Sequence, residues 1–406
     1  MPTTSTARLL RRVRDLGDQV CARWFATNFN ETTFAEIATE CLLESDFSEK
    51  IELRDLFRIL LQEKHSQPTH AFSDLAIRLY ETPEFFIELL CWINGSNAIH
   101  EHPFSGAFHV LEGSGVHARY NFEPTEVISK RFQIGECSIS ESEILRKGMT
   151  RSIMPGAETL HSLYHVEQPS LTLVIRGHRE NWHTPQMAVD RPHVAFDYEY
   201  YTDRQVEFCV SALNTAYAVS EDQAKLMLID AVSSLDLARV YVVCARLDVW
   251  DYVTSGDMRE LLESRFGQLG SKIVDSILYR RRLQVLHRHR LAEKEPQRRL
   301  FIGLLAVIES KSHIDSLLGE ISDPRANLRK FVEFLLSYMA ADSTDTTEDY
   351  ALKVEVLYSV IREGVDGGLA AAERAFIAQG RSLRKEAFAS AYAELLQDPV
   401  AGRLLS

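Results

Sequence analysis

The fold of this 406-residue chain is decided by the stretch Ala98-Ile-His-Glu-His-Pro-Phe-Ser-Gly-Ala-Phe-His-Val-Leu-Glu-Gly113. His100 and His102 are two residues apart in a run with the composition of a β-strand, and a strand sends alternate side chains to one face. A second segment, Met154-Pro-Gly-Ala-Glu-Thr-Leu-His161, places a third histidine on another expected strand. Three neutral imidazoles on one side of a first-row metal leave positions open for further ligands. The spacing therefore predicts a metal site formed by His100, His102 and His161.

The residues around this stretch are predicted to form many short strands. Between residues 84 and 202, β-prone runs alternate with glycine, proline, serine and asparagine, which is typical of a sandwich or small barrel. Residues 1–83 carry apolar residues at helical spacing, and we expect them, including a helix over residues 72–79, to pack on the barrel. Residues 203–406 return to helical periodicity with short loops. The sequence thus predicts an α+β multidomain protein with an N-terminal helical segment (1–83), a β-barrel carrying the metal site (84–202) and an all-α C-terminal domain (203–406).

The composition narrows the class of partners. The net charge is −13 at pH 7, which argues against nucleic-acid binding because phosphate binding needs a basic footprint. One basic run, residues 280–290, is interpreted as a solvated helix face that pairs with acidic helices. No apolar run reaches membrane-spanning length, and the six cysteines form no CxxC pair. We therefore expect a cytoplasmic protein with no nucleic-acid and no membrane partner.

The histidine motifs carry a family resemblance. Residues 84–185 resemble the cupin superfamily, with His100-x-His102 as the first motif and Pro155-Gly156-x4-His161 as the second. Within that superfamily, residues 90–102 and the segment from Leu160 to Ile175 are most similar to cysteine dioxygenase-like thiol dioxygenases. The resemblance implies an antiparallel cupin β-barrel (jelly roll) in which three histidines hold Fe(II). It also implies that O₂ and a small amino-acid thiol bind at the open positions.

The chain departs from this family at several positions. Ala107 stands where four-ligand cupins carry a glutamate and where animal-type cysteine dioxygenases carry a cross-linked cysteine. His109 is two residues further on, so we expect it to share a face with Ala107 and to point into the barrel. His165, four residues beyond His161, and Tyr164 complete the candidate catalytic residues. Each of these three also has a structural alternative as a core side chain. The departures indicate a small amino-acid-like substrate other than cysteine.

Two arginines are candidates for binding a substrate carboxylate. Arg78 precedes the barrel by about the distance at which the family places its carboxylate-binding arginine. Arg176 falls near the position of the family's tyrosine, on an expected buried strand. A guanidinium matches a carboxylate through two parallel hydrogen bonds, and a buried arginine needs an anionic partner. Arg176 is therefore either part of an internal ion pair or a substrate clamp.

Three functions remain open from the sequence. The first is a mononuclear non-haem Fe(II) oxygenase that uses O₂ on a small amino-acid-like molecule, with another first-row divalent metal as the alternative to iron because imidazole discriminates weakly. The second is a cupin metalloenzyme that oxidises or rearranges an N-hydroxylated amino acid in natural-product biosynthesis, forming N–N bonds. The third is a cupin sensor or scaffold with a helical partner-binding domain. The C-terminal helices are expected either to form a homodimer or to cover the barrel mouth.

Overall fold

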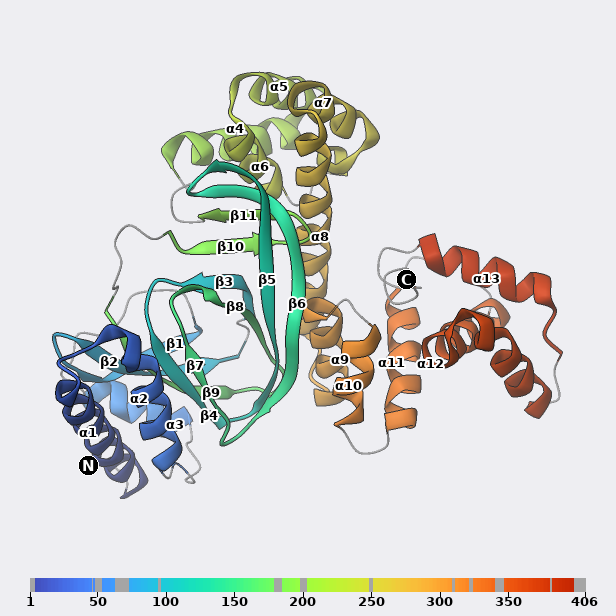
Figure 1. Ribbon diagram of the computed structural model, residues 1–406. Helices are drawn as coiled ribbons and strands as arrows, with labels where there is room; N and C mark the ends of the chain where they lie inside the picture. Colours follow the sequence, from blue (N-terminus) through green and yellow to red (C-terminus); the bar gives the residue numbers. More distant parts are fainter. Residues whose placement is uncertain are drawn as a thin grey trace. The chain divides into compact units, whose positions relative to one another are not determined.

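The computed structural model describes residues 4–45, 47, 53–62, 73–93, 96–178, 185–197, 203–247, 251–308, 311–320, 324–339, 347–379 and 382–397 (Figure 1). The N-terminal helices are α1 (Thr4–Ala26), α2 (Glu31–Glu44) and α3 (Leu53–Gln62). The strands that follow are β1 (Leu75–Glu81), β2 (Phe85–Trp92), β3 (Ser96–His102), β4 (Gly106–Glu112), β5 (Ser114–Ser129), β6 (Phe132–Arg146), β7 (Thr150–Ile153), β8 (Gly156–His165), β9 (Ser170–Gly177), β10 (Met187–Asp190) and β11 (Val194–Asp197).

The strands form two connected sets. Within the described residues, one set is a five-stranded sheet in the order β1-β2-β9-β4-β7, and the other is a closed barrel in the order β10-β11-β6-β5-β8-β3. The strand pairs that bear on the site, β3 with β8, β5 with β8 and β4 with β9, are antiparallel. The antiparallel barrel with N-terminal helices and a C-terminal helical region confirms the predicted fold class.

The N-terminal helices cover the five-stranded sheet (Figure 1). On α1, buried apolar side chains recur every three or four residues at Leu9, Val13, Leu16 and Val20, which gives the helix one apolar face. That face shares a core with α2, α3 and the sheet side chains Ile77, Leu79, Phe85, Ile87, Leu89, Cys91, Ala107, Leu111, Leu171, Leu173 and Ile175. The side of the sheet that faces the helices is therefore closed to a ligand.

Strand β4 is buried on both faces, and the alternation of its side chains separates two cores. Ala107 and Leu111 belong to the core beneath the helices. Phe108 and Val110 belong to a second core with Leu90, Trp92, Phe104, Leu145, Ile153, Leu163 and Val174. This alternation determines which β4 side chains can reach the barrel interior.

The helix predicted over residues 72–79 is wrong where the structure describes it. Residues 75–81 form β1, which pairs antiparallel with β2 and places Arg78 opposite Glu88. Ile77 and Leu79 are buried and their neighbours are less so, which is the period-2 pattern of a half-buried strand. Pairing with β2 and packing against α1 decide between the two readings of this short apolar run. Phe72 lies outside the described residues.

The chain divides into two compact units, residues 1–141 with 145–291 and residues 142–144 with 292–406. The first unit includes α4 (Arg204–Val219), α5 (Glu221–Ser234), α6 (Leu237–Arg246), the 3₁₀ turn η1 (Asp251–Thr254), α7 (Gly256–Phe266) and α8 (Gln268–Ala292, to residue 291). These helices share a core with the barrel strands β6 and β11, in which the Tyr241 ring lies 5.8 Å from Phe132 and 5.5 Å from Phe196. The division into three domains at residues 83 and 202 stays a prediction.

Apart from residues 142–144 of β6, the second unit is helical in its described residues. It contains α9 (Pro296–Val307), α10 (Lys311–Gly319), α11 (Pro324–Met339), α12 (Thr347–Ala378) and α13 (Lys385–Gln397). Helix α12 packs against both α11 and α13. None of the helices in the described part of the chain is long and apolar enough to cross a bilayer.

The basic run 280–290 lies on α8 and is not simply a solvated face. Arg280 donates to Asp190 at the end of β10, with Nη1 2.8 Å from the carboxylate. Arg290 is fully buried and donates to the backbone carbonyl of His165 at 2.9 Å. Part of the run therefore fastens α8 to the barrel.

Candidate metal centre

The three predicted histidines converge inside the barrel. β3 and β8 pair antiparallel with His100 opposite His161, and irregular register on either side of His100 lets His102 turn toward the same place. One ring nitrogen of each histidine lies within 4.8 Å of the others. Two of these nitrogens are in direct contact: Nε2 of His102 lies 2.9 Å from Nε2 of His161. The three histidines thus lie together, and the register irregularity that turns His102 was not part of the prediction.

The environment keeps these imidazoles neutral. All three side chains are buried. Burial lowers the pKa of His100, and burial together with the neighbouring histidines lowers the pKa of His102 and of His161 well below the ordinary value. The charge of Arg176 lowers the pKa of His102 further. A neutral imidazole has the lone pair that a metal ligand needs.

Hydrogen bonds set the tautomers of two rings. Nδ1 of His100 donates to the Ala98 carbonyl at 2.8 Å, so the lone pair of the ring is on Nε2. Nδ1 of His161 lies 2.9 Å from Nε2 of His117 on β5. With Nε2 of His161 directed at the cluster, its Nδ1–H donates to His117, the usual outer-shell arrangement of a metal-binding histidine. His117 was missed at the sequence level, because its place depends on the pairing of β5 with β8.

The donor set fits a first-row divalent metal. Two cis nitrogen ligands at about 2.1 Å from an ion are about 3 Å apart, which matches the 2.9 Å between His102 and His161. The three ligand nitrogens lie within 4.8 Å of one another, so a rotation of one imidazole ring would bring all three to metal-binding distance. Imidazole suits iron, zinc, nickel and copper, so these ligands do not choose among them.

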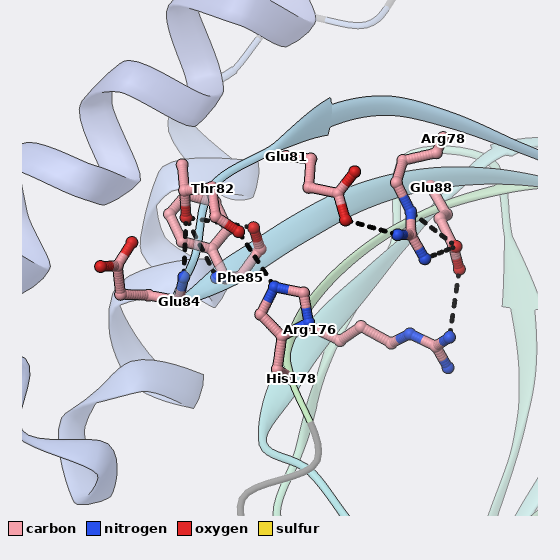
Figure 2. A network of polar contacts seen from close by, with 8 residues as sticks. All are labelled: Arg78, Glu81, Thr82, Glu84, Phe85, Glu88, Arg176 and His178. Carbon is pink, nitrogen blue, oxygen red and sulfur yellow. Dashed lines mark hydrogen bonds and ion pairs between the residues drawn. The ribbon is translucent and has the colours of Figure 1, made fainter. Parts of the chain in front are cut away.

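A cavity of about 360 Å³ opens beside the cluster, and His102 and His161 form part of its wall. Most of the remaining wall is apolar, being formed by Phe86, Leu90, Trp92, Phe104, Phe108, Ile153, Leu163 and Val174. The polar lining side chains are Glu88, Thr172, Arg176, His178 and Gln186. His178 is fixed by a contact of its Nε2 with the Thr82 carbonyl at 2.9 Å (Figure 2). A small organic molecule can therefore lie against the histidine cluster.

Of the two candidate arginines, Arg176 lines the cavity and Arg78 does not. Arg176 also forms an ion pair, with Nη2 3.3 Å from Oε2 of Glu88. Arg78 donates to Oε1 of the same glutamate through Nε at 3.3 Å and Nη2 at 3.0 Å. Arg78 thus contacts two cavity residues, Glu88 and Phe86, without lining the cavity itself. The sequence left two alternatives for Arg176, an internal ion pair or a residue of the binding cavity. The structure shows that Arg176 forms the ion pair and also lines the cavity.

The structure places His109 away from the cavity, which corrects the expectation that it points into the barrel. His109 and Ala107 do share a face of β4, but it is the face beneath the N-terminal helices. Nδ1 of His109 contacts the Thr150 hydroxyl at 2.8 Å, and its ring lies 5.9 Å from that of Phe47. His109 is a buried structural histidine here.

Tyr164 and His165 are also built into the packing. Tyr164 follows the cavity residue Leu163 in β8, so its side chain points to the opposite face of the strand. On that face, the Arg290 guanidinium carbon lies 4.6 Å from the centre of the Tyr164 ring. His165 stacks on Trp92 at 4.5 Å and contacts the Ser170 hydroxyl at 3.0 Å. Neither residue is part of the cavity wall. A direct catalytic role for these two stays a prediction without support from their positions.

Comparisons with known proteins found distant similarity to several solved structures. No family model matches the chain, and no curated protein matches it. Similar solved structures include a DMSP lyase from Ruegeria pomeroyi (14% identity, 43% of this chain and 96% of that one, TM-score 0.24) and a hydroquinone 1,2-dioxygenase from Sphingomonas (13%, 34% and 86%, 0.22). A cupin-2 domain protein from Shewanella frigidimarina is 16% identical over 32% of this chain and 94% of its own, with a TM-score of 0.20. Likenesses at this level define neither an activity nor a metal for this chain.

The fold and the cluster together define a class. A closed antiparallel barrel joined to a second sheet, with three histidines directed at one point inside it, fits the cupin architecture. Within that class, the chain has the features of a metal-binding protein with a cavity for a small molecule.

Proposed function

We propose that this protein is a mononuclear non-haem metal oxygenase that acts on a small carboxylate-bearing, amino-acid-like molecule. His100, His102 and His161 would hold the metal, with Fe(II) as the proposed ion. The observation that carries the proposal is the presence, on one cavity, of a neutral three-histidine cluster and a half-buried arginine. When bound, such a metal supplies the redox chemistry by which O₂ oxidises an organic compound.

The side chains of the chain supply binding and orientation. Arg176 would hold the substrate carboxylate, so that the rest of the molecule lies along the apolar wall toward His102 and His161. Phe104 and Phe108 exclude water from that wall, which strengthens every electrostatic contact within it. His117 keeps the His161 ring in one orientation through the 2.9 Å contact with its Nδ1. The three ligands carry no charge, so a divalent ion would keep its full positive charge toward an anionic substrate.

Metal content and O₂ consumption test this function. Protein reconstituted anaerobically with Fe(II) should contain one ion per chain and consume O₂ only when a substrate is present. His161→Ala should lose both properties. His109→Ala is the matched control, because His109 is a similarly buried histidine on β4 that faces away from the cavity. Retention of metal by His161→Ala, or equal losses in both variants, would contradict the proposal.

A substrate panel separates the enzymatic alternatives. Small thiols that carry a carboxylate should drive O₂ uptake if the chemistry is that of a thiol dioxygenase. N-hydroxylated amino acids should do so instead if the chain oxidises or rearranges such compounds. A chain that binds these molecules without stoichiometric metal and without consuming O₂ fits the sensor or scaffold alternative.

A further inference from the structure

A row of alternating charges runs through the wall of the cavity (Figure 2). Glu81 accepts from Nη1 of Arg78 at 2.6 Å, and Arg78 donates in turn to Oε1 of Glu88. Oε2 of Glu88 forms an ion pair with Arg176, whose Nη2 lies 3.3 Å away. The row thus reads negative, positive, negative, positive, and Arg176 is its end inside the cavity. An anion bound in the cavity next to Arg176 would continue this alternation of charges.

Arg176 is held so that its edge can meet a ligand. The guanidinium carbon lies 4.7 Å from the ring centre of Phe86 and 4.9 Å from that of Phe104, which fixes its plane between aromatic groups. Only Nη2 contacts Glu88, and Nε is buried with no hydrogen-bond partner among the described residues. The Arg176 side chain is 22% exposed and lines the cavity, so an anion there can reach the guanidinium through its accessible atoms.

Glu88 is not available to a cation. Oε1 accepts from Arg78, Oε2 is ion-paired with Arg176, and the side chain is 1% exposed. Among the described residues that line the cavity, it is also the only carboxylate. An ammonium group in this cavity would lose its water, meet no unshared carboxylate and lie near the positive charge of Arg176.

The apolar wall has room for a sizeable hydrocarbon group. An apolar protein cavity of roughly 150 Å³ is enough to hold benzene. The cavity here, at about 360 Å³, can therefore take a ring or branched chain together with the group that reaches Arg176. Trp92, Phe104 and Phe108 provide aromatic surfaces for such a group.

We propose that the ligand of this cavity is an organic acid with a single carboxylate, an apolar body and no ammonium group. This inference rests on the proposed function for the identity of the active site, and it narrows the substrate class from amino-acid-like compounds to acids without the amine. Arg176 binds the carboxylate. Glu88 orients Arg176, and because Arg78 also pairs with Glu88, this glutamate is not available to bind a cation.

Calorimetric titration of the full-length protein tests the proposal in the presence of a chelator, so that metal binding plays no part. The probes are two matched series, 3-phenylpropionate with L-phenylalanine and phenethylamine, and hexanoate with hexylamine. We expect at least one of the two acids to bind, phenylalanine to bind about tenfold more weakly than phenylpropionate or worse, and neither amine to bind. Equal or tighter binding of phenylalanine, or no binding of either acid at millimolar concentration, would overturn the proposal.

The variant Arg176→Met tests the role of the arginine. It should weaken binding of the acid by about tenfold or more. Its fold should survive because Arg78 still neutralises Glu88, and circular dichroism checks this. Arg259→Met is the matched control, since Arg259 pairs with Asp275 outside the cavity wall. Unchanged acid binding by folded Arg176→Met would overturn the assignment, and the selectivity of the unaltered protein decides the ligand class if that variant does not fold. A protein that selects acids but holds no metal would refute the proposed oxygenase and leave this inference standing.

Discussion

Acid should destabilise the metal-free protein through its histidine cluster. Burial, the neighbouring histidines and other nearby charges hold the pKa of His102 and of His161 well below the ordinary 6.5. In the unfolded chain both imidazoles return to ordinary behaviour. Above pH 6.5 they are neutral in both states and contribute no pH dependence. As the pH falls below 6.5, the unfolded chain takes up protons that the folded chain does not, so the free energy of unfolding decreases.

The magnitude follows from proton linkage. Each histidine that is protonated only in the unfolded chain lowers the free energy of unfolding by about 1.4 kcal/mol for each pH unit. His102 and His161 together therefore give a slope of about 2.8 kcal/mol per pH unit once the unfolded chain is fully protonated at both. A typical domain is stable by about 5–15 kcal/mol, so two pH units of acid remove a large part of the stability.

Urea unfolding followed by tryptophan fluorescence measures this slope. All four tryptophans of the sequence fall within residues 1–291, so the signal reports the unit that holds the cluster. Titrations between pH 8 and pH 5, with a chelator present, should be compared for the unaltered protein and for His102→Gln. The variant should lose about 1.4 kcal/mol per pH unit of the slope below pH 6.5. The two curves should run parallel above pH 7, which serves as the internal control.

The reasoning would be refuted in either of two ways. Burial raises the pKa of Glu101 to about 7, which gives a slope of the opposite sign between pH 6.5 and pH 5. If the free energy of unfolding stays level over this range even in the Glu101→Gln background, the histidines are not kept neutral by the fold. If His102→Gln keeps the full slope, the acid sensitivity comes from other groups.

Three further predictions concern single side chains. His117→Ala should weaken metal binding about 10- to 100-fold in a chelator competition, because it removes the acceptor of a ligand's Nδ1–H, and His117→Gln should restore part of the affinity. Gly106→Ala should destabilise the fold by about 3 kcal/mol or more in thermal unfolding. The added Cβ would lie 2.1 Å from the Ile175 carbonyl oxygen, and normal stability would disprove this close approach. Tyr241→Phe should lower the free energy of unfolding by about 1–3 kcal/mol, since buried Asp190 loses a donor, and an unchanged urea midpoint would contradict that.

The fold was predictable where periodicity and punctuation agree. The alternation and glycine-bounded runs of residues 84–202 indicated a barrel, and the helical spacing of residues 9–25 and 34–43 indicated α1 and α2. Residues 75–81 were not predictable in the same way, because a short apolar run fits either a strand or a helix. Their conformation depends on β2, which offers Glu88 opposite Arg78. That partner lies close in sequence, but the pairing is tertiary information.

The site was predictable to the extent that strand parity constrains it. Parity places Ala107 and His109 on one face, yet it does not say which face looks into the barrel, because that depends on where the N-terminal helices pack. Parity alone does argue against Tyr164, which is three residues from His161 and therefore points to the opposite side of β8. His117 needed the pairing of β5 with β8, which no local pattern contains.

The two interpretations of Arg176 left open by the sequence turn out to be one arrangement. An isolated guanidinium in an apolar cavity is unfavourable, and a fully paired one has no edge left for a ligand. The register of β2 resolves this conflict, since it puts Glu88 opposite Arg78 and Phe86 opposite Arg176. Glu88 is thereby shared between two arginines, and Arg176 receives enough counter-charge to be buried while its Nε side stays unpaired. Removing Glu88 would therefore free Arg176 from its only ion pair here and loosen its aim, whereas removing Arg78 would leave Glu88 to pair more closely with Arg176. The second change should weaken acid binding more selectively than it weakens the fold, because it converts a ligand-binding arginine into a satisfied ion pair.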